Sequence, residues 1–167
     1  TLFNIYNTPI SLLIWTTTPW TLPANLAVAI NPTLSYSLVK FKNQHLIVAH
    51  ERIEDLSKQL NTPLQTIQTI SGNQLVNLTY THPFLEKTNP IIDADFVTTD
   101  DGSGLVHIAP GHGTDDYLAG LKHKLDVYCP VLADGCFDNS VPEWLQQTSI
   151  WDANTIIIQN LETSGHL

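Results

Sequence analysis

The chain has 167 residues, 43% of them hydrophobic, which is enough apolar material for one domain with its own core. Sixteen acidic residues oppose seven basic ones, so the formal charge is −9, whereas a nucleic-acid-binding domain usually carries a basic face. If this chain meets a nucleic acid, we expect it to touch only an end, or to be held there by a partner segment.

Two further exclusions follow from the composition and patterning. No apolar run is long enough for a membrane helix, and no charged segment followed by an apolar one indicates a signal peptide. The spacing of Cys129 and Cys136 matches no strong zinc pattern, and we expect both thiols to be reduced. The chain opens on Thr1 and has no methionine, as an excised piece would. We therefore expect residues 1–167 to be a single cytoplasmic domain of a larger protein.

Short strands dominate the predicted elements. Apolar or alternating segments predict strands at residues 12–15, 26–30, 35–41, 44–49, 91–98, 105–109 and 127–132, and further short strands within 64–78 that are broken at residues 71–73. Residues 35–41 and 44–49 should form a hairpin, and helical spacing or capping predicts helices at 50–60 and 114–124. Many short strands without a βαβ alternation favour a mixed α/β, β-rich fold. We expect a closed β-barrel core of short strands with peripheral helices.

The first polar motif, TTTPWTLPAN, covers residues 16–25. Its three threonines before Pro19 are most simply a strand end, because threonine is β-branched and proline stops a central strand. Alternatively, Thr16 and Thr18 point to one side of an extended segment and present two hydroxyls that can position a water or a ribose hydroxyl. Trp20 and Asn25 would then add an aromatic wall and an amide.

The second polar motif, GSGLVHIAPGHGTDDY, covers residues 102–117. His107 lies within a predicted strand and is most simply a hydrogen-bonded core residue, and the glycines on either side of His112 suit a tight turn. Asp115 and Asp116 suit a helix N-terminus, where acids offset the dipole. Because adjacent residues of a helix face different ways, we expect one aspartate to cap and the other to face a site.

Other chemistries fit these residues less well. A metal site would draw on His107, His112, Asp115 and Asp116, but their spacing matches no known metal pattern. Residues 101–104, DGSG, resemble an aspartic-protease loop, yet they lack its serine or threonine after the aspartate and the second copy. No specific Ser–His–Asp arrangement can be assembled either. We therefore expect neither a cofactor nor a metal.

Taken together, the two motifs resemble the editing domain of the class I aminoacyl-tRNA synthetases for isoleucine, valine and leucine. The resemblance runs from Leu13 to the WDAN segment at residues 151–154. Members for valine and leucine typically have an arginine after two threonines and a PAHD turn, whereas this chain has Thr18 and the turn PGHG at residues 110–113. This combination is similar to the isoleucine-specific members. Ser103 stands where the family usually has threonine, which is a conservative change.

The resemblance implies an editing hydrolase that removes valine mis-attached to the 3′ end of isoleucine tRNA, with valyl adenylate as a second candidate substrate. Valine is smaller than isoleucine by only one methylene, so a pocket for isoleucine excludes valine weakly. Such enzymes therefore use a second, hydrolytic site that removes the wrong amino acid. Water would attack the aminoacyl ester directly, without a covalent nucleophile or cofactor. The partners implied are the 3′ end of the aminoacylated tRNA, its valine and the remainder of the parent synthetase, in the cytoplasm and away from membranes.

The same resemblance assigns roles to individual residues. The catalytic group comprises Thr16, Thr18 and Asp116, in which the Asp116 carboxylate holds the substrate's α-ammonium. Substrate binding falls to Thr17, Trp20, Asn25, His107 and Asp116. Within this set, Trp20 and His107 shape the side-chain pocket, and Asn25 supports the first loop. One alternative stays open: a non-catalytic module that binds aminoacyl-adenosine or the tRNA end without hydrolysing it.

Overall fold

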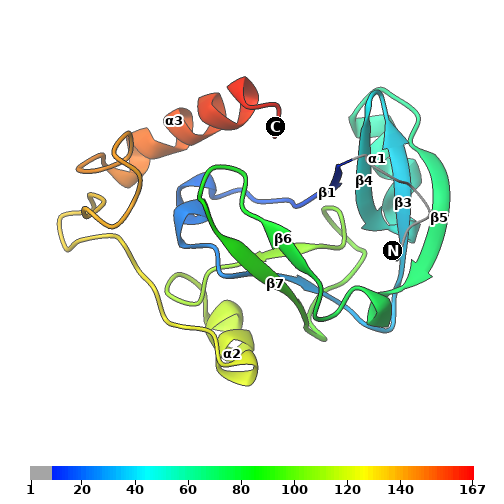
Figure 1. Ribbon diagram of the computed structural model, residues 1–167, viewed down its shortest axis with the longest axis horizontal. Helices are drawn as coiled ribbons and strands as arrows, with labels where there is room; N and C mark the ends of the chain where they lie inside the picture. Colours follow the sequence, from blue (N-terminus) through cyan, green and yellow to red (C-terminus); the bar gives the residue numbers. More distant parts are fainter. Residues whose placement is uncertain (1–8) are drawn as a thin grey trace. The chain divides into compact units, whose positions relative to one another are not determined.

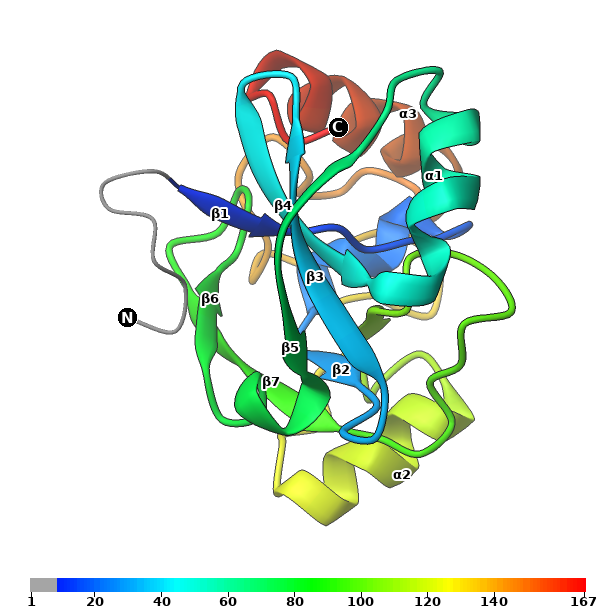
Figure 2. The same cartoon turned by 90° about the vertical axis from the view of Figure 1, so that its right-hand side faces the viewer.

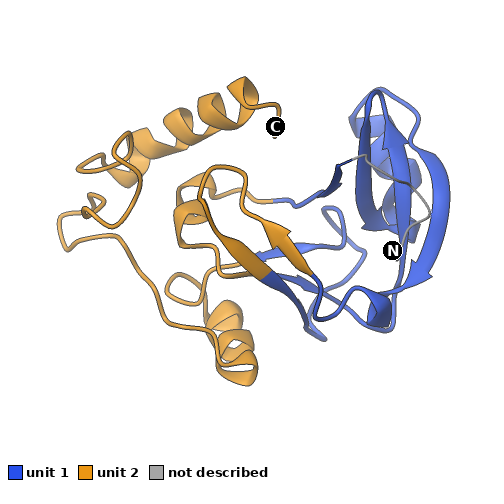
Figure 3. Cartoon of the chain, in the orientation of Figure 1, with its two compact units in different colours: residues 1–15, 28–78, 90–107 blue, residues 16–27, 79–89, 108–167 orange. Residues whose placement is uncertain are grey.

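The computed structural model describes residues 9–167, which form two compact units interleaved along the sequence (Figure 3). Unit 1 contains the residues up to Trp15 together with Val28–Leu78 and Pro90–His107. Unit 2 contains Thr16–Ala27, Thr79–Asn89 and Ile108–Leu167. The first polar motif therefore lies wholly in unit 2, and the second is divided immediately after His107.

Unit 1 contains a four-stranded sheet with the order β1-β4-β3-β5 (Figures 1 and 2). These strands are β1 (Ile10–Leu12), β3 (Ser35–Phe41), β4 (Gln44–Ala49) and β5 (Gln65–Ser71). The predicted hairpin is confirmed as the antiparallel pair β3–β4, and β1 runs parallel to β4. Lys42 takes a left-handed conformation, with φ 51°, in the two-residue turn of this hairpin.

A helical segment follows the hairpin in unit 1. The predicted helix at 50–60 is present as a 3-10 turn η2 (His50–Arg52) followed by the helix α1 (Ile53–Gln59). Leu56 lies on its buried face, as the spacing indicates, and joins a cluster of apolar side chains from the sheet and from Leu64, just before β5. That cluster comprises Val39, Leu46, Val48, Leu56 and Leu64.

A second four-stranded sheet has the order β6-β7-β2-β8. Its strands are β2 (Ala27–Ile30), β6 (Thr79–Thr81), β7 (Thr88–Asp93) and β8 (Val106–Ile108). β2 pairs in parallel with β7, and all four of its residues are buried, as expected for a continuous apolar run in a parallel pair. The strand predicted at 91–98 therefore begins and ends earlier, and β6 was not predicted.

The predicted closed β-barrel is wrong. A barrel closes only when its first and last strands hydrogen-bond to each other. In the described residues the first sheet ends at β1 and β5, and the second ends at β6 and β8. The fold is mixed α/β with two open, mixed four-stranded sheets. Strands β1, β6 and β8 have only three residues each, which leaves short ladders for the tilt and stagger that closure requires.

Unit 2 contains the 3-10 helix η1 (Pro19–Ala24) and the helices α2 (Thr114–His123) and α3 (Ile150–Thr163). The predicted helix at 114–124 is confirmed as α2. The strand predicted at 127–132 is wrong, since within it only Val131 forms an isolated bridge, to Phe137. Among the described residues, no helix has both the length and the apolar character needed to cross a membrane.

Candidate functional site

The two polar motifs meet within unit 2. The rings of Trp20 and His112 pack edge to face, with their centroids 5.1 Å apart and their planes at 89°. A backbone bond also joins the two motifs, because the Leu26 N–H, which follows the first motif, donates to the Ile108 carbonyl of the second at 2.9 Å. The Trp20 N–H donates to Asn154 Oδ1 of α3 at 3.0 Å, which ties the loop to that helix. Segments far apart in the sequence therefore form one local structure, as both motifs require if they share a function.

The threonine loop is held by its own side chains. The Thr18 N–H donates to Thr16 Oγ1 at 3.0 Å, a local side-chain-to-backbone bond typical of threonine outside helices. The Thr21 hydroxyl donates to the Thr18 carbonyl at 2.9 Å, and Pro19 opens η1, where a missing N–H is tolerated. Because Thr16 Oγ1 is an acceptor here, its own proton can still be donated. Thr16 and Thr18 are half-buried, and Thr17 is exposed.

Asn25 lies in a buried amide network beneath this loop and is only 3% exposed. Its Nδ2 donates to the Ala27 carbonyl at 2.8 Å, and its Oδ1 accepts from Asn89 Nδ2 at 3.0 Å and from the Tyr80 hydroxyl. Burial raises the pKa of Tyr80 to about 12, so this phenol remains a donor at neutral pH. These bonds engage the amide atoms of Asn25 and tie the end of η1 to β2, β6 and β7.

Asp116 lies in the first turn of α2 and turns back toward the preceding loop. Its Oδ2 accepts from the Ala109 N–H at 2.8 Å. Burial raises the pKa of Asp116, with a smaller contribution from the neighbouring Asp115 charge, and the Ala109 bond opposes this rise. Asp115 is exposed, and the N-cap of α2 is Gly113, without a side-chain cap. The two aspartates therefore face different ways, as expected, but neither occupies the capping position.

The Gly111–Gly113 turn places His112 against Trp20. The His112 N–H donates to the Ala109 carbonyl at 2.9 Å, which closes the turn. A Cβ at Gly111 would lie 2.3 Å from the Tyr128 carbonyl oxygen, so this position requires glycine. Burial lowers the pKa of His112, which keeps its ring neutral at pH 7. Its Nε2 is buried and has no hydrogen-bond partner among the described residues.

His107 lies in the middle of β8, in unit 1, and is 8% exposed. Its side chain is therefore packed against its surroundings. In the chain it precedes Ala109, the partner of Asp116, by only two positions.

A family model described as "Leucyl-tRNA synthetase, editing domain" matches residues 1–162 of the chain. The chain belongs to this family of synthetase editing domains. It is 40% identical over 166 residues to the isoleucine–tRNA ligase of Acaryochloris marina, covering 99% of this chain, and 45% identical over 160 residues to that of a Synechococcus species, covering 95%. In both comparisons the chain spans 17% of the relative's length.

Solved structures share the fold of this editing domain. The crystal structure of GlLeuRS-CP1 superposes with a TM-score of 0.76 at 18% identity, covering 97% of this chain and 84% of that one. The Plasmodium knowlesi cytosolic leucyl-tRNA synthetase editing domain gives a TM-score of 0.69 at 14% identity, covering 94% and 82%. At such identities these likenesses establish the fold alone.

Several supporting residues of the editing domain were missed in the sequence. Tyr80 and Asn89 hold Asn25, and Asn154 holds the Trp20 backbone. Asn154 belongs to the WDAN segment, and its amide side chain there is the one feature of the sequence that could have indicated such a contact. The others lie in weakly patterned segments, and a buried amide network leaves no periodicity in a sequence.

Unit 2 of the editing domain also contains a cavity of about 460 Å³. Pro23 and Leu26 line it from the side of the first motif, together with Lys87 and Asp126, but none of the predicted site residues does. Burial lowers the pKa of Lys87, and the Asp126 charge opposes this effect. Over residues 9–167, no group of three or more histidine, cysteine, aspartate or glutamate side chains is arranged to hold a metal.

Proposed function

We propose that residues 1–167 form a single editing domain of a longer synthetase and hydrolyse valine from mischarged isoleucine tRNA. The observation that carries this proposal is the meeting of the two motifs in unit 2, where the Trp20 and His112 rings are in contact. Asp116, four residues after His112, is held by a hydrogen bond from the Ala109 N–H. The identity to isoleucine–tRNA ligases supports the choice of tRNA.

The reaction depends more on positioning the attacking water than on activating the ester. An aminoacyl ester is already reactive, so water attacks its carbonyl carbon, the ester bond breaks, and the ribose hydroxyl leaves with a proton. Thr16 and Thr18 are the groups proposed to hold this water and the terminal adenosine, with Thr17 beside them. Holding water near the carbonyl removes much of the entropic barrier. The bond from the Thr18 N–H to Thr16 Oγ1 supports this role, because it preorganises the loop before substrate arrives.

Asp116 is the group proposed to bind the substrate's α-ammonium. A carboxylate that bonds a cationic ammonium forms a strong, charge-assisted contact. The Ala109 N–H occupies Oδ2 at 2.8 Å, which fixes the carboxyl plane and leaves Oδ1 for the ligand. Valyl adenylate carries the same ammonium and is a second proposed substrate.

Selection against isoleucine is assigned to Trp20 and His107. An editing site must bind the valine side chain and exclude that of isoleucine, which has one more methylene. The residues that exclude isoleucine must therefore be rigid. His107 is buried in a strand, and Trp20 is held by Asn154 and by the His112 ring. These restraints support a steric sieve.

The acidic character of the chain supports a division of labour with the remainder of the parent synthetase. With a formal charge of −9, the domain should repel a tRNA body, whose binding depends on basic contacts to phosphates. We assign it only the 3′ end, and place it in the cytoplasm, where tRNA is charged and used.

Deacylation assays with the full-length protein test this function. The expected result is fast hydrolysis of Val-tRNA(Ile) and slow hydrolysis of Ile-tRNA(Ile). Tight binding of both charged tRNAs without turnover of either would favour the alternative, a binding module for the aminoacylated tRNA end.

A further inference from the structure

A six-residue turn, Thr99–Gly104, leads into β8 and carries little regular structure of its own. Two of its residues, Gly102 and Gly104, have positive φ angles of 64° and 76°. Glycines of this kind leave a free turn conformationally permissive. β8 lies beside β2 in its sheet, and the placement of its first residues, with His107 three positions beyond Gly104, also depends on what holds this turn.

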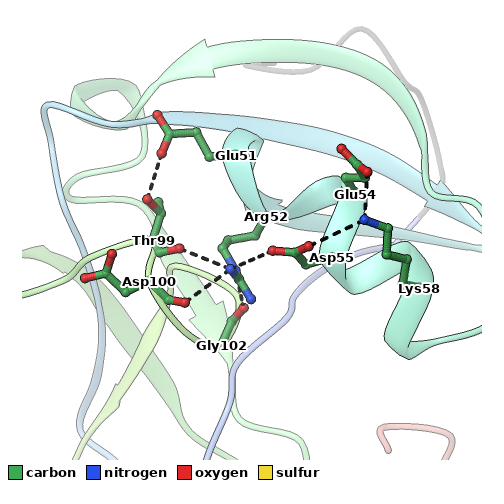
Figure 4. Close-up of polar contacts among 8 residues, drawn as sticks. All are labelled: Glu51, Arg52, Glu54, Asp55, Lys58, Thr99, Asp100 and Gly102. Carbon is green, nitrogen blue, oxygen red and sulfur yellow. Dashed lines mark hydrogen bonds and ion pairs between the residues drawn. The ribbon is translucent and has the colours of Figure 1, made fainter.

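Arg52 holds the turn through its carbonyl groups (Figure 4). Its Nε donates to the Gly102 carbonyl at 3.0 Å, and its Nη1 donates to the carbonyls of Thr99 at 3.2 Å and Asp100 at 3.3 Å. One planar guanidinium thus contacts three carbonyls of a single turn, which a lysine ammonium on its flexible stem cannot reproduce.

Neighbouring groups complete the hold on the turn. The Ala49 N–H donates to the Ser103 carbonyl at 2.8 Å, and the Tyr36 hydroxyl donates to the Gly104 carbonyl at 2.8 Å. A Cβ at Gly104 would lie 2.3 Å from Ala49 Cβ, so the turn also packs too closely to shift inward. We refer to Arg52 and Tyr36, which donate from side chains, as the carbonyl clamp.

Stability alone does not explain why Arg52 is buried, because burying a charge carries a desolvation penalty. The residue is only 8% exposed, and its carboxylate partner Asp55, at 3.0 Å, has a side chain that is 51% exposed. A buried charge stabilises a fold less well than packed apolar groups unless its geometry is exacting. Here three of its bonds go to one turn, which indicates that placement of that turn is what the arginine provides.

We propose that Arg52 is a positioning residue for His107, and that the carbonyl clamp thereby sets the selectivity of the editing site. The proposal rests on the proposed function, in which His107 refuses the extra methylene of isoleucine. A wall that discriminates a single methylene is sensitive to small displacements. Loosening the turn should therefore relax selectivity before it abolishes hydrolysis.

The test compares Arg52→Lys with Asp55→Asn in the full-length protein. Arg52→Lys keeps the charge and loses the fork, so the rate of Ile-tRNA(Ile) deacylation relative to Val-tRNA(Ile) should rise by about tenfold. Asp55→Asn removes the ion pair and leaves the three carbonyl bonds, and its rate ratio should stay at the wild-type value. Hydrogen exchange over residues 99–108 should accelerate in Arg52→Lys alone.

Unchanged selectivity in Arg52→Lys, with only a lower melting temperature, would overturn the proposal, as would unchanged hydrogen exchange. If Arg52→Lys does not fold, Tyr36→Phe removes one clamp bond, together with the acceptor of the Asn31 N–H at 2.9 Å, and should shift the ratio in the same direction by a smaller factor. No shift there counts equally against the clamp. Failure of the proposed function is a separate result, because it appears as absent Val-tRNA(Ile) hydrolysis in the wild-type protein, whereas exchange still reports the clamp.

Discussion

Replacing Asp116 by asparagine separates its charge from its geometry. Asparagine has the same shape, and its carbonyl oxygen can still accept the Ala109 N–H bond that the aspartate makes at 2.8 Å. Alanine removes charge and acceptor together and leaves the N–H of Ala109, a residue only 1% exposed, without its partner. An unsatisfied buried donor costs about 1–3 kcal/mol, so the alanine variant mixes a stability loss with any functional loss.

The expected effect of Asp116→Asn on catalysis is large. Truncating one partner of a hydrogen-bonded charge pair costs about 2–5 kcal/mol. At about 1.36 kcal/mol per decade, this lowers kcat/KM for Val-tRNA(Ile) by roughly 30-fold to several thousand-fold. Single-turnover deacylation measures the effect, with Asp115→Asn as the matched exposed control. A wild-type rate in Asp116→Asn, or a comparable loss in Asp115→Asn, would refute the assignment of the ammonium contact.

The pH dependence provides a second check on Asp116. Because burial raises its pKa, deacylation should increase with pH through a pKa higher than that of an ordinary aspartate, as the ionised form appears. The native state keeps this proton to higher pH than the unfolded chain does, so in that window stability should fall as pH rises. Both effects should disappear in Asp116→Asn, and pH–rate profiles with thermal unfolding at matched pH values measure them.

The remaining predictions concern the loops and walls of the site. Thr16→Val and Thr18→Val keep volume and branching, and at least one should lose most hydrolysis while remaining folded; normal rates in the double variant would leave the threonines with a purely structural role in the loop. His107→Ala should allow deacylation of Ile-tRNA(Ile), since overlap of one methyl with a packed ring costs about 1–3 kcal/mol. If the variant still does not hydrolyse Ile-tRNA(Ile), other residues must exclude isoleucine. Gly111→Ala should destabilise the domain in thermal unfolding, because its Cβ would meet the Tyr128 carbonyl at 2.3 Å, and an unshifted melting temperature would contradict this. Deacylation should survive extensive chelation, and activity restored by Zn²⁺ after EDTA would disprove the metal-free mechanism.

Local patterns in the sequence were sufficient where a segment is specified by its own residues. The β3–β4 hairpin alternates and has a two-residue turn, and α2 follows a glycine-rich turn with acids in its first turn. Helix α3 was not predicted, because the run of three isoleucines at 156–158 obscures the one-sided apolar spacing of a helix. Its Ser149 cap and its buried residues Ala153, Ile157 and Leu161 at four-residue spacing are evident only when the whole segment is considered.

The sequence by itself determined which residues we propose for the site, because hydroxyls, glycines and paired acids concentrate in two short motifs. It also carried the family likeness that the whole-chain match bears out. The tertiary structure alone decided that the sheets stay open, and that Asn25 is committed to Tyr80 and Asn89 beneath the loop. It alone turned Asp116 toward Ala109 while leaving Asp115 exposed. Strand neighbours and buried polar partners come from segments far apart in the chain, and such contacts leave no periodic trace in either segment.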